Sequence, residues 1–453
     1  MARNRVIYQS EAVYVGPSPA VSGFFKSNGL GGHVEGWNGA KDLGTGKTNN
    51  GIATGANGGA AGAESFPNAI KQLHRVQTCN YSFNIARTDI NQFGELAAID
   101  RVVMDTPTVA LDFSYILATM DNEANLGFTV AKGVSCISGL LNKASDEKNY
   151  FVKTVAEGED AVGDLSKAAG EGGNAVTDTI SVIGVGNGFL TSYATECSVG
   201  NFPTCSVSVE GMNMTFNNSV SGGSPAISPE SGTRLDHFKY CIPVATGSAG
   251  TGILATSALR PGDITFEFQK ADSEGGHLSD VSAGGLNSYD APGATLGDMT
   301  SKAHAKIQSY NINLDMGREP INRLGSRFAF TREITFPMTV SCSIDALVAD
   351  LTTGSLSDVI NCDDSYDITV NLLRPTNCPG DSAVAKEIFA QYALKNCKVD
   401  AQSFSSDIGS NKSVTLDFST QIGGPNQVRQ GLFMSGIFAD DFEPIIQDSS
   451  AMQ

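Results

Sequence analysis

Two glycine-rich stretches come closest to a nucleotide-binding motif. The run Gly44-Thr45-Gly46-Lys47-Thr48 has the form of the end of a phosphate-binding loop. The complete motif needs a glycine where this chain has Lys41, and it needs an apolar strand before it, which the sequence does not provide. The run at 184–188 leads into the strand-like letters FLTSY and not into a helix, so a dinucleotide fingerprint does not fit either. We therefore expect no nucleotide cofactor.

Metal-binding and catalytic patterns are also missing from the sequence. The adjacent acids Asp363-Asp364 and Asp440-Asp441 lack the glycine-punctuated spacing of a calcium loop, so we interpret them as solvated turns. No GxSxG elbow, no Ser/His/Asp grouping and no carboxylate pair with a partner is found. The histidines, which are not spaced as metal ligands, stand at positions 33, 74, 237, 277 and 304. We expect no metal ion, no cofactor and no enzymatic activity.

Composition indicates a chain that repels nucleic acid. Its 453 residues include 30 basic and 48 acidic side chains, which give a formal net charge of −18, and no basic stripe is present. The nine cysteines form no CxxC pair, and several fall on the apolar phase of strands, so we expect reduced thiols in a protein made in a cytoplasm. The opening letters MARNRVIYQSEAV do not resemble a secretory signal. No apolar run approaches the roughly 18 residues of a membrane span, so we expect no membrane partner.

The elements of the chain are organised by an internal repeat. Residues 76–94 and 307–325 match at a constant offset of 231 residues, and their apolar positions keep the same phase. The identical pairs are Gln77 and Gln308, Asn80 and Asn311, Arg87 and Arg318, Ile90 and Ile321, Asn91 and Asn322, and Gly94 and Gly325. Because the offset is about half the chain length, the repeat predicts a duplicated domain.

Further strand signals recur in the same order along the two halves. The matched segments are 103–116 with 334–345, 149–155 with 366–372, and 190–211 with 394–419. Their alternating apolar residues are typical of half-buried strands. The sequence therefore predicts a mainly β protein, with one small antiparallel sandwich or half-barrel in each half. We expect a first domain at 1–222 and a second at 223–453, with the repeat core at 307–425.

Some segments depart from this strand pattern. Pro107 and Pro337 cannot donate to a ladder, so each predicts a bulge, an edge or a break. Helices are expected at 381–393 and, with a weaker pattern, at 158–170. The glycine-rich stretch 16–66, which holds the only tryptophan, is interpreted as a mobile arm or as a loop ordered by another subunit.

The polar faces of the repeated strands carry amide, hydroxyl and acid groups with almost no lysine or arginine. Asn80, Ser82 and Asn84 match Asn311, Asn313 and Asp315, and the later strands contribute Glu210 and Asp417. One interpretation is an ordinary solvated sheet face. The other is the inner wall of a water-filled barrel through which a polyanion must pass without sticking.

Two stretches carry a resemblance to a known family. They are REITFPMTVSCSIDALVADLTTGSLSDVI followed by DITVNLL, at 332–373, and VGNFPTCSVSVEGMNM, at 199–214. The pattern resembles the major tail tube proteins of long-tailed, siphovirus-like bacteriophages, in particular the fused kind with two tube domains in one chain. The resemblance covers the four strand blocks of each half and leaves out 16–66 and much of 220–306.

The resemblance implies a structural virion protein of the phage tail, assembled in the host cytoplasm. Each tube domain would carry a short α-helix, and three chains would complete a pseudo-hexameric ring whose sheets join into an intersubunit β-barrel. Rings would stack, with 16–66 or a loop in 220–306 making contacts between rings or subunits. The expected partners are further copies, the tape-measure protein, and tail-tip, baseplate and terminator proteins. DNA would pass without specific binding, along a lumen lined by the eight polar residues named above.

Two other functions remain open at this point. Another phage structural component, such as a baseplate or capsid decoration protein, would share the fold class without stacking into a tube. A carbohydrate-active β-protein would need clustered aromatic residues and paired carboxylates, and the sequence offers one tryptophan and no such pair.

Overall fold

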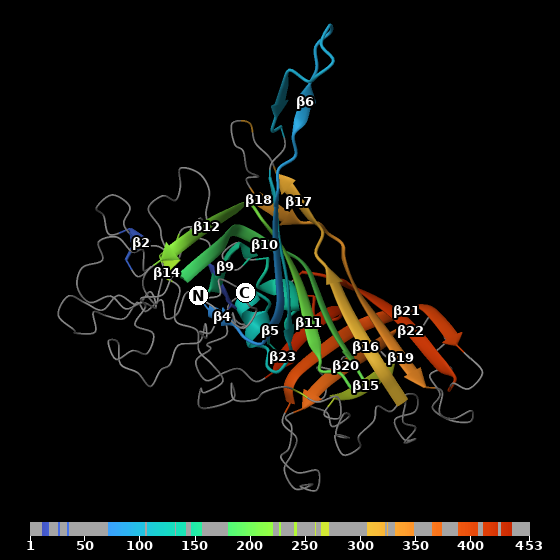
Figure 1. Ribbon diagram of the computed structural model, residues 1–453. Helices are drawn as coiled ribbons and strands as arrows, with labels where there is room; N and C mark the ends of the chain where they lie inside the picture. Colours follow the sequence, from blue (N-terminus) through green and yellow to red (C-terminus); the bar gives the residue numbers. More distant parts are fainter. Residues whose placement is uncertain are drawn as a thin grey trace, which may run out of the picture.

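The molecule is built almost entirely from antiparallel strands (Figure 1). The computed structural model describes residues 11–17, 26–27, 34–35, 71–104, 107–131, 133–141, 146–155, 180–220, 226–227, 240–241, 259, 264–270, 306–321, 324, 331–347, 365–373, 388–405, 411–424 and 427–436. The mainly β fold class predicted from the sequence is confirmed.

Within its described residues, the first half of the chain contains strands β1 to β12 and two short helices. The strands are β1 (Glu11–Pro17), β2 (Lys26–Ser27), β3 (Val34–Glu35), β4 (Lys71–Leu73), β5 (Val76–Asn84), β6 (Thr88–Ile90), β7 (Asp100–Val102), β8 (Thr108–Ile116), β9 (Lys148–Thr154), β10 (Ile180–Ser198), β11 (Thr204–Gly211) and β12 (Asn213–Val220). The helices are α1 (Asp121–Leu126) and the single-turn 3-10 helix η2 (Cys136–Ser138).

The second half contains strands β13 to β23. They are β13 (Ala226–Ile227), β14 (Tyr240–Cys241), β15 (Ile264–Lys270), β16 (Lys306–Asp315), β17 (Arg318–Ile321), β18 (Thr331–Ile334), β19 (Met338–Leu347), β20 (Tyr366–Leu373), β21 (Ile388–Ser405), β22 (Ser413–Ile422) and β23 (Gly431–Gly436).

Fifteen strands join into one sheet, and two long strands divide it into two groups. We call β5, β8, β11, β16, β19, β22 and the C-terminal parts of β10 and β21 the main sheet. The N-terminal parts of β10 and β21 pair instead with the covering strands, which are β1, β4, β9, β12, β15, β20 and β23. At the bends, Asn187 and Asn396 have φ values of 53° and 57°. Asparagine tolerates this left-handed conformation better than most residues.

The covering strands pack over one face of the main sheet. Aromatic rings meet between the two groups, with ring centroids 6.4 Å apart for Phe113 and Tyr150 and 5.4 Å apart for Phe266 and Tyr310. Alternate residues of the main sheet, such as Leu111, are fully buried in a single hydrophobic cluster that draws on both halves. The face of the main sheet on the other side carries no covering strand among the described residues.

Strand pairings of the first half recur in the second. The corresponding pairs are β5·β8 with β16·β19, β8·β11 with β19·β22, β10·β11 with β21·β22, β9·β10 with β20·β21, β10·β12 with β21·β23, β1·β9 with β15·β20, and β6·β7 with β17·β18.

The irregularities of these pairings recur as well. The bulge between Val76 and Thr78 matches one between Ile307 and Ser309, and the bulge at Leu190/Ser192 matches one at Val399/Ala401. Corresponding residues are therefore 231 positions apart in β5 and β16 and 209 positions apart in β10 and β21. The domain limits of 1–222 and 223–453 stay a prediction.

Several local predictions were wrong or are untested. Residues 388–393, expected to be helical, belong to β21, where β20 and β23 pair on both sides and override the helical propensity of the segment. Residues 381–387, the helix expected at 158–170 and most of 16–66 and 220–306 lie outside the described residues. By contrast, the prediction of a bulge, an edge or a break at Pro337 is confirmed as a break, since β18 ends at Ile334 and β19 begins at Met338. The described sheet ends at β5 and β15, so within one chain it is open and forms no closed barrel.

Truncating one apolar side chain in each half will test the different environments of matched positions. Leu314 on β16 is fully buried, whereas Phe83, its counterpart on β5, is 41% exposed. Leu314→Ala is expected to lower the free energy of unfolding of the unassembled chain by about 2–5 kcal/mol, because it leaves a cavity. Phe83→Ala is expected to lower the free energy of unfolding by less than half of that amount. Urea unfolding of both variants measures the difference, and equal losses would contradict the assigned environments.

Candidate assembly surface: a polar sheet face and two free strand edges

The uncovered face of the main sheet carries mostly polar residues, with small residues such as Ala194 between them. A row that crosses it runs from Ser206 through Ala194, Asn313 and Ser341 to Ser419, each opposite the next. The strand register places all eight predicted lumen residues on this same face. They are Asn80, Ser82, Asn84, Glu210, Asn311, Asn313, Asp315 and Asp417. Whether this face lines a lumen stays a prediction.

Acidic groups dominate the charge of this polar face. Among the side chains that the structure describes on its main-sheet strands are six carboxylates and one lysine, Lys398; the carboxylates are Asp112, Glu196, Glu210, Asp315, Asp345 and Asp417. Hydroxyl groups fix some of these acids, since Ser309 donates to Asp345 over 2.7 Å and Ser343 donates to Asp417 over 2.7 Å. Glu210 differs from the others because its Oε2 forms an ion pair of 2.6 Å with Arg332. A face of this kind repels the phosphates of a nucleic acid.

The two halves of the chain meet edge to edge through β10 and β16. Seven residue pairs join these strands, from Ser192 opposite Asp315 to Ser198 opposite Ser309. The pairing buries the apolar side of β16, where Tyr310, Ile312 and Leu314 are at most 3% exposed. The main sheet thereby runs without interruption from one half into the other.

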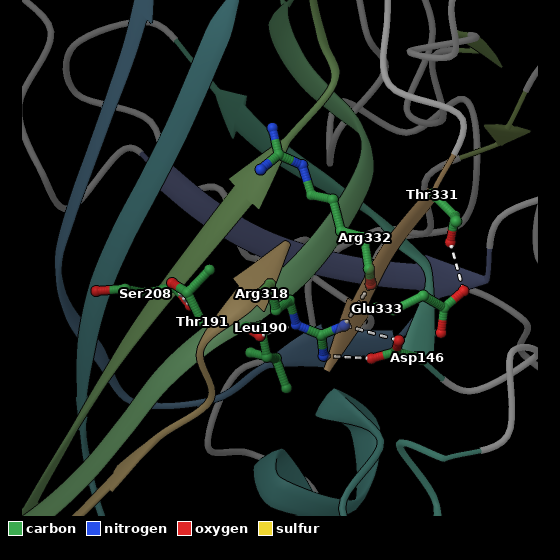
Figure 2. Close-up of polar contacts among 8 residues, drawn as sticks. All are labelled: Asp146, Leu190, Thr191, Ser208, Arg318, Thr331, Arg332 and Glu333. Atoms are coloured by element: carbon green, nitrogen blue, oxygen red, sulfur yellow. Dashed lines mark hydrogen bonds and ion pairs between the residues drawn. The ribbon is translucent and has the colours of Figure 1, made fainter. Parts of the chain in front are cut away.

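Arg318 clamps this junction from the start of β17 (Figure 2). Its Nε donates to the carbonyl oxygen of Leu190, over 2.5 Å, and its two terminal nitrogens donate to the carboxylate of Asp146, over 2.8 and 2.5 Å. The guanidinium carbon also lies 5.2 Å from the ring centroid of Phe189. The Arg318 side chain is fully buried, so the fork of donors is satisfied inside the protein. Burial raises the pKa of Asp146, and the guanidinium partly offsets the rise.

The strand that corresponds to β16 in the first half, β5, has no partner on its outer side among the described strands. Tyr81, Phe83 and Ile85 are 38%, 41% and 38% exposed. Their counterparts in the second half, which the β10 junction covers, are Ile312, Leu314 and Met316, all fully buried. An edge strand with exposed apolar side chains is a template for pairing with another chain.

A second free edge lies at the other end of the main sheet. Residues 398–405 of β21 pair with β22 on one side, and no described strand pairs with them on the other. This segment corresponds to the part of β10 that receives β16. Phe404 is 46% exposed, whereas its counterpart Thr195 is fully buried. Among the described strands, the main sheet of a single chain therefore has two free edges, on β5 and on β21. They correspond to the edges of β16 and β10, which pair with each other inside the chain.

A buried polar cluster links the main sheet of the first half with helix α1 and with the N-terminal part of β21 in the second half. The hydroxyls of Tyr115 and Tyr193 donate to Oε1 of Glu123 over 2.7 and 3.0 Å, and the hydroxyls of Tyr193 and Tyr392 lie 2.7 Å apart. Glu123 is fully buried on α1, and Tyr392 comes from β21 in the second half. Burial raises the pKa of Glu123 to about 7, although the hydrogen bonds from Tyr115 and Tyr193 counteract the rise.

The described residues contain no group of three or more His, Cys, Asp or Glu side chains arranged to hold a metal ion. Within the same part of the chain, no helix has the length and apolar character to span a membrane.

Comparison with known proteins finds similarity among solved structures. No protein-family model and no curated protein matches the chain. Among solved structures, it is similar to a chain of the anti-feeding prophage baseplate, determined by cryo-electron microscopy with sixfold symmetry applied. The two chains are 13% identical, and the match covers 29% of this chain and 79% of the other, with a TM-score of 0.19. A TM-score this low does not establish a shared fold.

Sequence reasoning missed most residues of the junction. The repeat aligned Arg318 with Arg87, but nothing in the spacing showed that Asp146, more than a hundred residues earlier, would accept its hydrogen bonds. Glu123 and Tyr392 were also missed, because a glutamate within a short helix and a tyrosine in an apolar run are ordinary in sequence. The only available signal was the identity of the two arginines.

The Glu123 cluster makes stability depend on pH in a defined direction. Because the folded pKa of about 7 lies above 4.5, the ordinary pKa of a glutamate, the native state holds the proton more tightly. The stability from this group is present in full at acidic pH and is lost as pH rises through about 7. Between about pH 5 and pH 8, titration of Glu123 is expected to lower the free energy of unfolding by about 2–3 kcal/mol. Glu123→Gln, which mimics the protonated form, is expected to abolish this part of the decrease. Urea unfolding across that range measures it, and parallel pH profiles for both proteins would contradict the assignment.

Proposed function

We propose that the chain is a structural virion protein of a phage-type tail and that its copies form the stacked rings of the tail tube. The observation that carries the proposal is the pair of matched free edges. Inside the chain, the edges of β10 and β16 are already joined, and the corresponding edges of β21 and β5 are left open at the two ends of the same sheet.

If the open edges of β5 and β21 pair between copies, the copies can form a closed ring. The contact is heterologous, because β5 of one copy meets β21 of the next, and a repeated heterologous contact generates a ring when its rotation closes. A closed ring removes both edges, as barrels do. Since each chain contains two similar halves, three chains would give the pseudo-hexameric ring that the resemblance to fused tube proteins implies.

The polar face is proposed to line the lumen of this ring. The opposite face of the main sheet is covered by strands such as β9 and β20, so the polar face is the one left free to enclose a channel. An inner wall whose described side chains include six carboxylates and one lysine would let DNA pass, because the carboxylates outnumber the cations that could replace its counterions. The tape-measure protein would occupy the lumen during assembly in the host cytoplasm.

Two projecting hairpins are proposed to connect one ring with the next. The hairpins β6–β7 and β17–β18 lie toward the same end of the molecule (Figure 1). Their matched tip residues, Phe93 and Leu324, are 106% and 104% exposed. Tail-tip, baseplate and terminator proteins would bind the terminal rings through the same surfaces. A baseplate or capsid decoration role is the alternative, and such a protein would form no stacks.

Mass and shape of the purified chain distinguish these functions. Light scattering is expected to give a particle of three chains, and negative-stain electron microscopy is expected to show rings or stacked tubes with a central hole. Phe93→Ser is expected to shorten the stacks and leave single rings, because it removes an apolar contact between rings. A compact monomer at high concentration would reject the tube, and rings that never stack would favour the alternative role.

Labelling from outside tests which face lines the lumen. Asn313→Cys puts a thiol on the polar face, and Phe216→Cys puts one on β12, where Phe216 is 62% exposed. After biotin-maleimide treatment of free subunits and assembly, gold-labelled streptavidin is expected to decorate the walls of Phe216→Cys tubes and to leave Asn313→Cys tubes bare. The unaltered chain gives the background from native cysteines. Gold along the walls of Asn313→Cys tubes would contradict an inward polar face.

A further inference from the structure

We propose that Arg87 of one copy clamps a second copy and fixes the register of strand pairing between them, as Arg318 does between the halves of its own chain. Arg87 precedes β6 as Arg318 begins β17, at the offset of 231 residues that relates β5 to β16. The inference rests on the ring contact of the proposed function and assigns its residues.

The clamp inside the chain recognises a specific point on a strand. Arg318 donates to the carbonyl oxygen of Leu190, which lies at the bulge where β10 shifts its register against β11. A bulge leaves a residue out of the ladder and re-aims the backbone, so it marks one place along an otherwise repetitive edge. An arginine fork that binds there distinguishes the correct register from one shifted by two residues.

The free edge of β21 has a bulge at the corresponding position. Its bulge lies between Val399 and Ala401, and the offset of 209 residues makes Val399 the counterpart of Leu190. The carbonyl oxygen of Val399 in a second copy is therefore the acceptor we assign to Arg87.

The register between copies follows from the same two offsets. On the β10–β16 junction, Ala194 lies opposite Asn313 and Thr195 lies opposite Ile312. Transferred to the free edges, Ser403 of one copy lies opposite Ser82 of the next, and Phe404 lies opposite Tyr81. The second pair brings together two aromatic side chains that are 46% and 38% exposed in the single chain. Cross-strand aromatic pairs of this kind stabilise sheets.

Arg87 is available for this role, and its neighbour on the hairpin is not. Arg87 is exposed and has no hydrogen bond or ion pair with any described residue. Arg101, the counterpart of Arg332, is instead held within the hairpin by Asp89, with 2.6 Å between its Nε and Oδ1 of the acid. The chain therefore offers a matched control, since one exposed arginine of the hairpin has a partner and the other does not.

Disulfide trapping tests the register. In the double variant Ser82→Cys/Ser403→Cys, the opposed Cα atoms would lie roughly 4.5–5.5 Å apart, which suits a disulfide, whereas diagonal neighbours at roughly 7–8 Å do not. Mild oxidation is expected to give covalent dimers and trimers on a non-reducing gel. Each single variant and the shifted pair Ser82→Cys/Ser405→Cys are expected to give less than about a tenth of that product.

Substitution of the arginines tests the clamp. Arg87→Ala is expected to raise the concentration needed for half-maximal assembly by about tenfold or more, which corresponds to about 1.4 kcal/mol. Arg101→Ala is expected to change it less than twofold. Arg87→Lys is expected to recover only part of the loss, because lysine lacks the fork. Circular dichroism of each unassembled variant checks that the chain is folded.

The outcomes separate this inference from the proposed function. Rings seen in the microscope together with equal trapping of the shifted pair, or with equal effects of the two alanine substitutions, would overturn the Arg87 clamp and leave the tube standing. Absence of rings under all conditions would overturn both. Trapping at the assigned pair, with selective loss for Arg87→Ala, supports both.

Discussion

The arrangement of this chain depends on the pairing of β10 with β16. That pairing joins the two halves into one continuous sheet, buries the apolar side of β16 and leaves the polar face uninterrupted. Arg318 and Asp146 hold it at the bulge of β10 with a buried ion pair. Breaking one partner of such a pair leaves an uncompensated buried charge, which costs about 3–5 kcal/mol. The junction is therefore a rigid template rather than an incidental contact.

The internal β10–β16 pairing indicates how the free edges of β5 and β21 can pair. Matched positions such as Ile312 and Tyr81 differ in exposure because β16 has a strand on each edge, whereas β5 pairs only with β8 among the described strands. In this duplicated chain the edge of β16 is paired internally, whereas the similar edge of β5 is left free to pair with another copy. The same logic explains why one arginine of the repeat is buried while the other is exposed.

Much of the strand content could be predicted from the sequence, because period-2 alternation and the repeat reinforce each other. The segments 149–155 and 366–372 correspond to β9 and β20, and the eight polar residues share one face as their alternation required. Within the helix expected at 381–393, residues 388–393 were predicted wrongly, because the pairing of β21 with two partner strands overrides local propensity. The Arg318–Asp146 pair and the Glu123 cluster join residues distant in sequence, so no local pattern contained them.

A cryo-electron microscopy reconstruction of the assembled protein at side-chain resolution would show how neighbouring copies meet. We expect residues 398–405 of each copy to pair with β5 of its neighbour in the register of the β10–β16 junction, around a channel faced by Asn313 and Asp417. Copies that meet through their covering strands, with the polar face turned to the outside, would contradict it.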